Sequence, residues 1–268
     1  MLKQRVITAV ILAPIAIACI FFLPKMGFIY FVGAVITVSA WEWANLAGLT
    51  GWQRYLYAAF VALCLLPAIH IPLSLVLSAA ALWWLAALFL VIQYPKRTSL
   101  WGEQWTRCLI GLLSLIPGFV ALVELKSYAD SSFLILMLFF LIWGADIGAY
   151  FTGKVIGKRK LAPDVSPGKS IEGLCGGVVV ALIIAVLMLQ WLGRPTLATV
   201  DGALFMLGCL GIILISVLGD LALSMFKRFR GVKDSSGLLP GHGGFLDRID
   251  SLLSAAPLFV LFLVVFQW

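Results

Sequence analysis

Nine apolar stretches, each long enough to cross a lipid bilayer, occupy most of this 268-residue chain. A helix needs about 20 mostly apolar residues to span the hydrocarbon core of a bilayer. The stretches cover residues 6–23, 28–47, 55–71, 73–94, 108–124, 132–152, 173–193, 202–222 and 252–268. Only 12% of the residues are charged, whereas roughly a quarter are charged in soluble domains. We therefore predict an all-α integral membrane protein, a polytopic bundle of about nine transmembrane helices, and exclude a soluble enzyme.

The stretches leave no room for a separate soluble domain, so residues 1–268 are interpreted as one membrane domain. The first five stretches make up an N-terminal part, residues 1–130, and the C-terminal half is 131–268. That half contains two long polar loops, 153–172 and 223–251. Long loops inside compact domains usually carry function. We therefore expect the active site in the C-terminal half.

The basic residues are distributed unevenly between the two sides of the predicted bundle. All but three of the 19 Lys and Arg residues fall in the segments on the N-terminal side, the exceptions being Lys25, Lys126 and Arg194. Cytosolic loops of membrane proteins are enriched in Lys and Arg. The N-terminus and both long loops are therefore predicted to be cytosolic. The same asymmetry accounts for the net charge of +7 without a nucleic-acid partner.

The 223–251 loop combines residues suited to phosphate with residues suited to metal. Its basic cluster is Lys227, Arg228, Arg230 and Lys233, which suits a polyphosphate but is also what the positive-inside bias alone would produce. A glycine turn, residues 241–244, allows close backbone approach and can present N–H groups to a phosphate. Asp247 and Asp250 follow, three residues apart and so on one helix face.

Asp220 lies inside the eighth apolar stretch, where an ionisable side chain is costly and usually functional. The eighth and ninth stretches form a helical hairpin, so we expect Asp220 to approach Asp247 across it. Mg²⁺ is usually bound by one or two carboxylates together with substrate phosphates. Asp146, near the end of the sixth stretch, is a third candidate or an ion-pair partner of a basic residue. Glu42, between two tryptophans, is left open between a site contact and an interfacial position.

The 27 residues from Ser224 to Asp250 resemble the signature of the phosphatidate cytidylyltransferases, the CDP-diacylglycerol synthases. Further segments resemble bacterial members of the same family. They are Gly144-Ala145-Asp146, Gly148-Ala149-Tyr150, Ser166-Pro167-Gly168-Lys169, Leu218-Gly219-Asp220 and Trp41-Glu42-Trp43. One departure is Leu223, where many relatives carry Glu. The resemblance covers nearly the whole chain, most clearly its C-terminal half.

The resemblance implies that CTP and phosphatidate react to give CDP-diacylglycerol and pyrophosphate, with Mg²⁺ as cofactor, in phospholipid biosynthesis at a bacterial inner membrane. The implied metal ligands are Asp220 and Asp247, supported by Asp146 and Asp250. The implied catalytic residues also include Lys227, Arg228, Lys233, Asp234, His242 and Arg248. The implied substrate-binding residues are Ser166, Lys169, Ser224, Gly243 and Gly244.

A polytopic secondary transporter would also carry intramembrane carboxylates, although near the bilayer midplane. The pair Gly173 and Gly177 has a spacing that packs helices closely, either within one chain or between two. Besides membrane lipid as a partner, we expect a homodimer.

Overall fold

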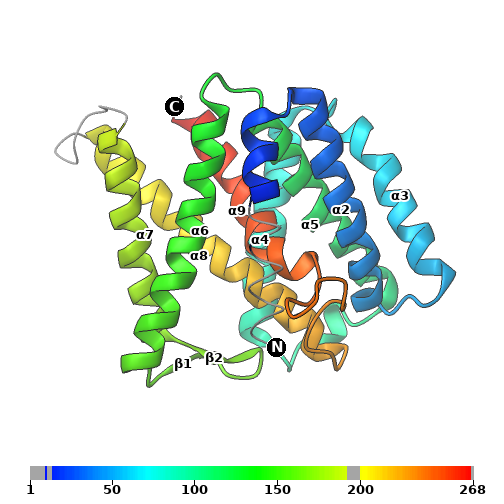
Figure 1. Ribbon diagram of the computed structural model, residues 1–268. Coiled ribbons are helices and arrows are strands. Elements are labelled where there is room, and N and C mark those ends of the chain that lie inside the picture. The colour runs from blue at the N-terminus through cyan, green and yellow to red at the C-terminus, as the bar shows by residue number, and fades with distance from the viewer. Residues whose placement is uncertain (1–9, 11–13, 192–199, 267–268) are drawn as a thin grey trace.

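The computed structural model, which describes residues 10, 14–191 and 200–266, is a bundle of long helices arranged side by side (Figure 1). Residues 14–22 are helical. The following helices are α2 (Lys25–Ala47), α3 (Trp52–Ala68), α4 (Leu73–Gln93), α5 (Gln104–Leu125), α6 (Ser131–Ile156), α7 (Ile171–Trp191), α8 (Val200–Phe229) and α9 (Leu246–Val265), with a short 3-10 helix η1 (Thr98–Leu100). The start of the predicted first stretch and part of the α7–α8 connection lie outside the described residues.

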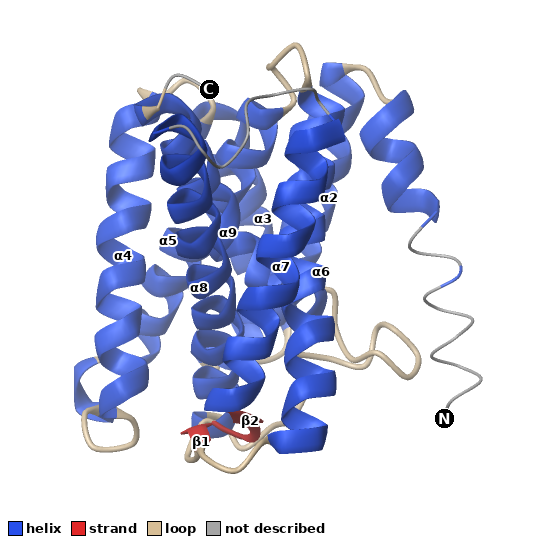
Figure 2. Cartoon of the chain, turned by 90° about the vertical axis from the view of Figure 1, so that its left-hand side faces the viewer, coloured by secondary structure: helices blue, strands red, loops and turns tan. Residues whose placement is uncertain are grey.

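Seven of the described helices are long and apolar enough to cross a membrane, and α3, with 17 residues, is shorter. The predicted polytopic all-α class is confirmed, with one small addition. Strands β1 (Lys160–Ala162) and β2 (Ser166–Ser170) form an antiparallel hairpin between α6 and α7, shown in red in Figure 2. Lys160 pairs with Ser170, and a turn at residues 163–165 connects the strands.

The two long loops are shorter than the sequence predicted. Helix α8 continues to Phe229 and α9 begins at Leu246, so the predicted 223–251 loop is reduced to residues 230–245. Helix α8 continues because residues 223–226 bury their side chains and Gly231 is the first residue there with a left-handed backbone. The predicted 153–172 loop is likewise reduced to 157–170, most of it in the β1–β2 hairpin. Helical order therefore reaches further into the polar segments than hydropathy indicated.

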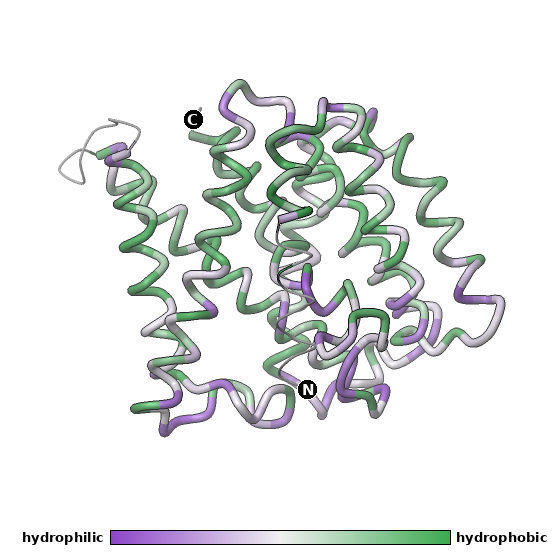
Figure 3. The backbone as a smooth tube through the Cα atoms, in the orientation of Figure 1, coloured by the Kyte–Doolittle hydropathy of each residue, from purple (hydrophilic) through white to green (hydrophobic). Residues whose placement is uncertain are grey.

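One end of the bundle, which we name the loop end, carries β1, β2 and the 230–245 loop (Figure 1). Hydrophilic residues gather at this end, whereas the middle of the helices is mostly hydrophobic (Figure 3). The described C-terminal end of α9 lies at the opposite end of the bundle (Figure 1). The fold therefore brings both polar segments of the C-terminal half to one end.

Helices α6 and α7 pack closely because glycines remove side chains from their contact. A Cβ atom on Gly148 would lie 2.8 Å from the Gly176 carbonyl oxygen and 2.9 Å from the Gly177 Cα. A Cβ on Gly173 would lie 2.9 Å from the Ala149 carbonyl oxygen, and one on Gly177 would overlap the Ala145 carbonyl. The Gly173–Gly177 pair thus packs within one chain, and the expected homodimer stays a prediction.

Replacing Gly177 with Leu is expected to destabilise the bundle, because α6 must move to make room. Over-packing of this kind costs about 1–3 kcal/mol. Thermal unfolding of the purified protein in detergent micelles measures the effect. Gly211→Ala is the matched control, since a Cβ there meets no atom within 4 Å. Equal melting temperatures for the two variants would contradict the close α6–α7 contact.

Candidate functional site

Three carboxylates from different helices converge near the loop end. Asp220 of α8 forms an ion pair with Lys169 of β2, with Nζ and Oδ2 2.6 Å apart, and accepts a hydrogen bond from the Ser224 hydroxyl at 3.3 Å. Asp250 of α9 lies within side-chain hydrogen-bonding reach of Asp220. Asp146 of α6 is close enough for its charge to interact with those of Asp220 and Lys169. These residues form the centre of the candidate site.

Arg248 adds a second positive charge to this centre. Its side chain is exposed and close enough to interact electrostatically with Asp146. Lys169 and Asp220 are both partly exposed, at 26% and 30% of their side-chain surface. The site is therefore open to a ligand and offers cations and carboxylates together.

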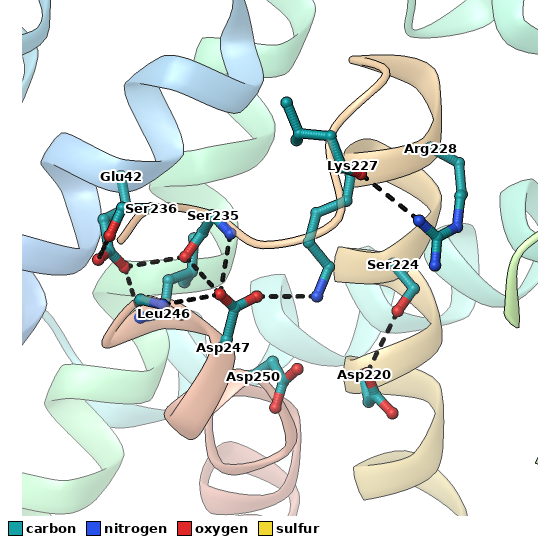
Figure 4. Close-up of polar contacts among 12 residues, drawn as sticks. Glu42, Asp220, Ser224, Lys227, Arg228, Ser235, Ser236, Leu246, Asp247 and Asp250 are labelled. Atoms are coloured by element: carbon teal, nitrogen blue, oxygen red, sulfur yellow. Dashed lines mark hydrogen bonds and ion pairs between the residues drawn. The ribbon is translucent and has the colours of Figure 1, made fainter. Parts of the chain in front are cut away.

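Asp247 belongs to a buried network that adjoins this centre, because Lys227 pairs with Asp247 and its charge also acts on Asp220 and Asp250 (Figure 4). Its Oδ1 accepts from Lys227 Nζ at 2.8 Å, and its Oδ2 accepts from the Ser235 N–H at 2.8 Å, the Ser235 hydroxyl at 2.9 Å and the Gly244 N–H at 2.9 Å. Oδ1 thus ties the first turn of α9 to the end of α8, and Oδ2 fastens the 230–245 loop to the same turn. A buried carboxylate with this many donors is well suited to hold backbone in place.

Of the two aspartates, Asp250 interacts directly with Asp220, whereas Asp247 is joined to α8 through Lys227. Asp247 lies in the first turn of α9, where its side chain folds back onto the loop. Asp250 lies one turn further into the helix and is on the side of α8 (Figure 4). Three-residue spacing places both aspartates on one face but does not decide which one interacts with Asp220.

Glu42 is the centre of the same buried network and has no exposed surface. It accepts hydrogen bonds from the hydroxyls of Ser235 and Ser236, at 3.1 and 2.6 Å, and from the N–H groups of Phe245 and Leu246, at 3.0 and 2.6 Å. Figure 4 shows Ser235, Ser236 and Leu246 gathered around its carboxylate. Glu42 thus attaches α2 to the loop and to the start of α9. The sequence signals for Glu42 are an acidic residue within an apolar stretch and the resemblance of Trp41-Glu42-Trp43 to a family segment.

The predicted basic cluster is divided by the fold. Lys227 is buried against Asp247, whereas Arg228 donates from Nε to the Val165 carbonyl at 3.2 Å. Arg228 therefore connects the β1–β2 hairpin to α8. Lys233 and its neighbour Asp234 are exposed on the 230–245 loop. Arg230, also exposed, donates from Nε to the Asn45 carbonyl at 3.0 Å, so among the described residues Lys233 is the member of the cluster whose side chain makes no hydrogen bond or ion pair.

The glycine turn, residues 241–244, is used to hold the 230–245 loop in its conformation. Gly243 has a left-handed backbone with φ of 80°, and a Cβ there would lie 2.9 Å from Asp247 Oδ2. The Gly244 N–H, expected to be available to a phosphate, is donated to Asp247. The neighbouring His242 has a buried Nδ1 that finds no hydrogen-bond partner among the described residues. His242 therefore retains the capacity to bind a ligand, whereas Gly244 does not.

A cavity of about 350 Å³ opens beside this centre, between α6, α7, α8 and β2. Asp146 and Lys169 line it, together with Tyr150, Lys154 and Ser170. Ser166, predicted to bind substrate, lies at the start of β2 and pairs with Ala162. The cavity thus brings two lysines and a carboxylate together at the loop end of the apolar helices.

The donor set fits Mg²⁺ only when a substrate supplies further ligands. Among the described residues, no group of three or more His, Cys, Asp and Glu side chains is arranged to hold a metal. Mg²⁺, however, is usually held by one or two carboxylates together with substrate phosphates and water. Two adjacent carboxylates, Asp220 and Asp250, meet that requirement.

The fold and site define a polytopic membrane protein with a carboxylate and lysine centre near one end of its helices. The chain belongs to the Cytidylyltransferase family, which it matches over residues 3–266. It is 48% identical over 271 residues to the phosphatidate cytidylyltransferase of Pseudomonas aeruginosa, covering 100% of this chain and 99% of the relative. The Haemophilus influenzae protein of that name is 40% identical over 283 residues, covering 98% of each chain. The Bacillus subtilis one is 35% identical over 189 residues, covering 68% of each. The resemblance found in the sequence is thereby confirmed.

Proposed function

We propose that this protein transfers the cytidylyl group of CTP to phosphatidate, giving CDP-diacylglycerol and pyrophosphate for phospholipid biosynthesis. The observation that carries the proposal is the meeting of Asp220, Asp250 and Lys169 beside a cavity that lies between apolar helices. A soluble nucleotide and a lipid phosphate can meet at such a place. Relatives matched over the full chain length bear the name of this activity.

In the proposed reaction, a phosphate oxygen of phosphatidate attacks the α-phosphorus of CTP. The bond from that phosphorus to the oxygen it shares with the β-phosphorus breaks, and pyrophosphate leaves. A phosphate monoester is already largely anionic at neutral pH, so the reaction needs no strong general base. Catalysis of this kind depends on positioning and on neutralising charge.

Each charged residue of the centre has a place in this scheme. Lys169 and Arg248 would neutralise and orient the phosphate groups, and Lys233 would attract the triphosphate. Asp220 and Asp250 would hold Mg²⁺, with Asp146 in support, and the ion would supply positive charge to the phosphate oxygens. Lys227 and Asp247 would keep the 230–245 loop in position.

We also propose that the loop end faces the cytosol of a bacterial cell and that the protein lies in the inner membrane. The excess of basic residues on this side supports the orientation, and the relatives described above are bacterial. CTP is a cytosolic nucleotide, so the orientation gives the site access to it. The alternative of a secondary transporter requires a site that is reachable from both sides of the membrane. The centre described here lies beside a cavity lined by β2 of the loop end.

The test is incorporation of label into lipid by the purified protein in detergent micelles, with CTP labelled in its α-phosphate. We expect chloroform-soluble label that requires both phosphatidate and Mg²⁺. Addition of EDTA is expected to stop the reaction and excess Mg²⁺ to restore it. Diacylglycerol in place of phosphatidate is the negative control, because it lacks the attacking phosphate. Failure to label phosphatidate with any divalent ion would overturn the proposal.

A further inference from the structure

A second cavity of about 540 Å³ runs between α4, α8 and the β1–β2 hairpin. Apolar side chains make up most of its walls, among them Val91 of α4 and Leu218 and Leu221 of α8. Three of its lining residues, Leu88, Ile92 and Leu214, are also exposed on the outside of the bundle. The cavity is therefore a groove that opens sideways toward the hydrocarbon core of the membrane. We name it the α4–α8 groove.

The groove adjoins the cavity of the candidate site. Leu161 of β1, Leu174 of α7 and Val217 of α8 line both of them. A molecule with its polar group beside Lys169 can therefore extend an apolar part into the groove past this shared wall. The polar residues that line the groove, Tyr94 and Asp164, lie at the loop end. Burial, together with the nearby Asp164 carboxylate, raises the pKa of Tyr94 above its usual range.

The length of the groove agrees with that of one leaflet of a bilayer. Its α8 lining extends from Gly211 to Leu221. Gly211 is nine residues from Asp220 along α8, which is about 13 Å at the helical rise of 1.5 Å per residue. Half of a hydrocarbon core is about 15 Å thick. A chain that follows α8 from the charged centre to Gly211 would thus have a path in the groove nearly as long as one leaflet is thick, along a helix that runs obliquely through the bundle (Figure 1).

Gly211 has a particular place in the groove. It lines the wall, and a Cβ atom built there meets no atom within 4 Å. The glycine is therefore not required by close helix packing, unlike Gly148 or Gly177. Its effect is to leave the deep part of the groove open.

We infer that the α4–α8 groove holds an acyl chain of the lipid substrate and that Gly211 determines how long a chain it accepts. The inference rests on the proposed function. It adds a specificity-determining residue and assigns the apolar part of the substrate to a defined surface. The occupant is lipid because the groove opens to the bilayer, is apolar, and is continuous with the site that would hold the phosphate.

The test compares dioctanoyl and dioleoyl phosphatidate as substrates of the wild type and of Gly211→Trp in detergent micelles. The tryptophan has space to enter the groove at its deep end. We expect kcat/KM for the dioleoyl substrate, relative to that for dioctanoyl, to fall by about tenfold or more, a range typical of discrimination by apolar pockets. Gly211→Ala adds only a methyl group and is expected to keep the wild-type ratio. Val179→Trp places the same large side chain on an exposed position of α7 that does not line the groove, and should also keep it.

The possible outcomes separate the inference from the proposed function. If the wild type is inactive on both lipids, the proposed function fails. If the wild type is active and Gly211→Trp keeps the wild-type chain-length ratio, the groove assignment is wrong.

If Gly211→Trp fails to fold, a second experiment tests the same assignment. It is photocrosslinking of the wild type with phosphatidate that carries a diazirine near the end of one acyl chain. Label on the groove-lining segments of α4 and α8 is expected, with phosphatidylcholine probe as the control. Label confined to other segments, or equal label from both probes, would overturn the assignment.

Discussion

Asp220→Asn is expected to lower kcat by about 100-fold or more, which is the usual cost of removing a group that stabilises charge in a transition state. The variant is expected to be nearly as stable as the wild type. Asp220 is where Lys169, Ser224 and Asp250 meet. Asparagine keeps the size of the side chain but removes the charge that pairs with Lys169 and would hold Mg²⁺. Partly exposed ion pairs contribute only about 0–1 kcal/mol to stability. Initial rates at saturating CTP and phosphatidate, together with thermal unfolding, measure the two effects.

The matched variant is Asp247→Asn, which changes the second residue of α9 in the buried network. It is expected to lower both the rate and the melting temperature, since both carboxylate oxygens hold neighbours in place. Asp250→Asn should behave like Asp220→Asn. If Asp220→Asn instead keeps full activity and a stably folded Asp247→Asn is inactive, then Asp247 rather than the Asp220 and Asp250 pair carries the chemistry.

The apolar stretches predicted the helices well because membrane-spanning segments must bury a long, continuous apolar surface and satisfy their backbone internally. Helix ends were less well predicted. Helix α8 continues through Lys227 to Phe229 because Phe226 and Lys227 remain buried, and hydropathy cannot distinguish a buried lysine from one in a loop. The hairpin of β1 and β2 was missed because it is short and polar.

The charged centre was partly predictable for a similar reason. Asp220 was identified by its position inside an apolar stretch, and Lys169 by its resemblance to a family segment. The choice between Asp247 and Asp250 depends on how the 230–245 loop folds back onto α9, which spacing along the helix does not specify. The partners of Glu42 lie 193 to 204 residues away in the chain. No local sequence pattern predicts contacts between residues that are so far apart along the chain.

Glu42→Ala is the substitution expected to destabilise the protein most, by about 3–5 kcal/mol. It removes the acceptor of the Ser236 hydroxyl and of the Phe245 and Leu246 N–H groups, and each buried donor left without a partner costs about 1–3 kcal/mol. The Ser235 hydroxyl keeps Asp247 as an acceptor and so loses less. Thermal unfolding in detergent measures the loss of stability, and hydrogen exchange of the Phe245 and Leu246 amides reports the loss of these particular bonds.

Two further variants separate the role of the carboxylate at this position from a general effect of removing an acid. Glu42→Gln retains one oxygen acceptor, so it is expected to lie between the wild type and Glu42→Ala in both melting temperature and amide protection. Glu103→Ala removes an exposed carboxylate that caps no N–H group at the start of α5, and it should leave both unchanged. Because Glu42 fastens the loop that also carries the contacts of Asp247, Glu42→Ala should reduce activity as well. Unchanged exchange at Phe245 and Leu246 in a stable Glu42→Ala protein would show that the loop is held by Asp247 and Lys227 alone.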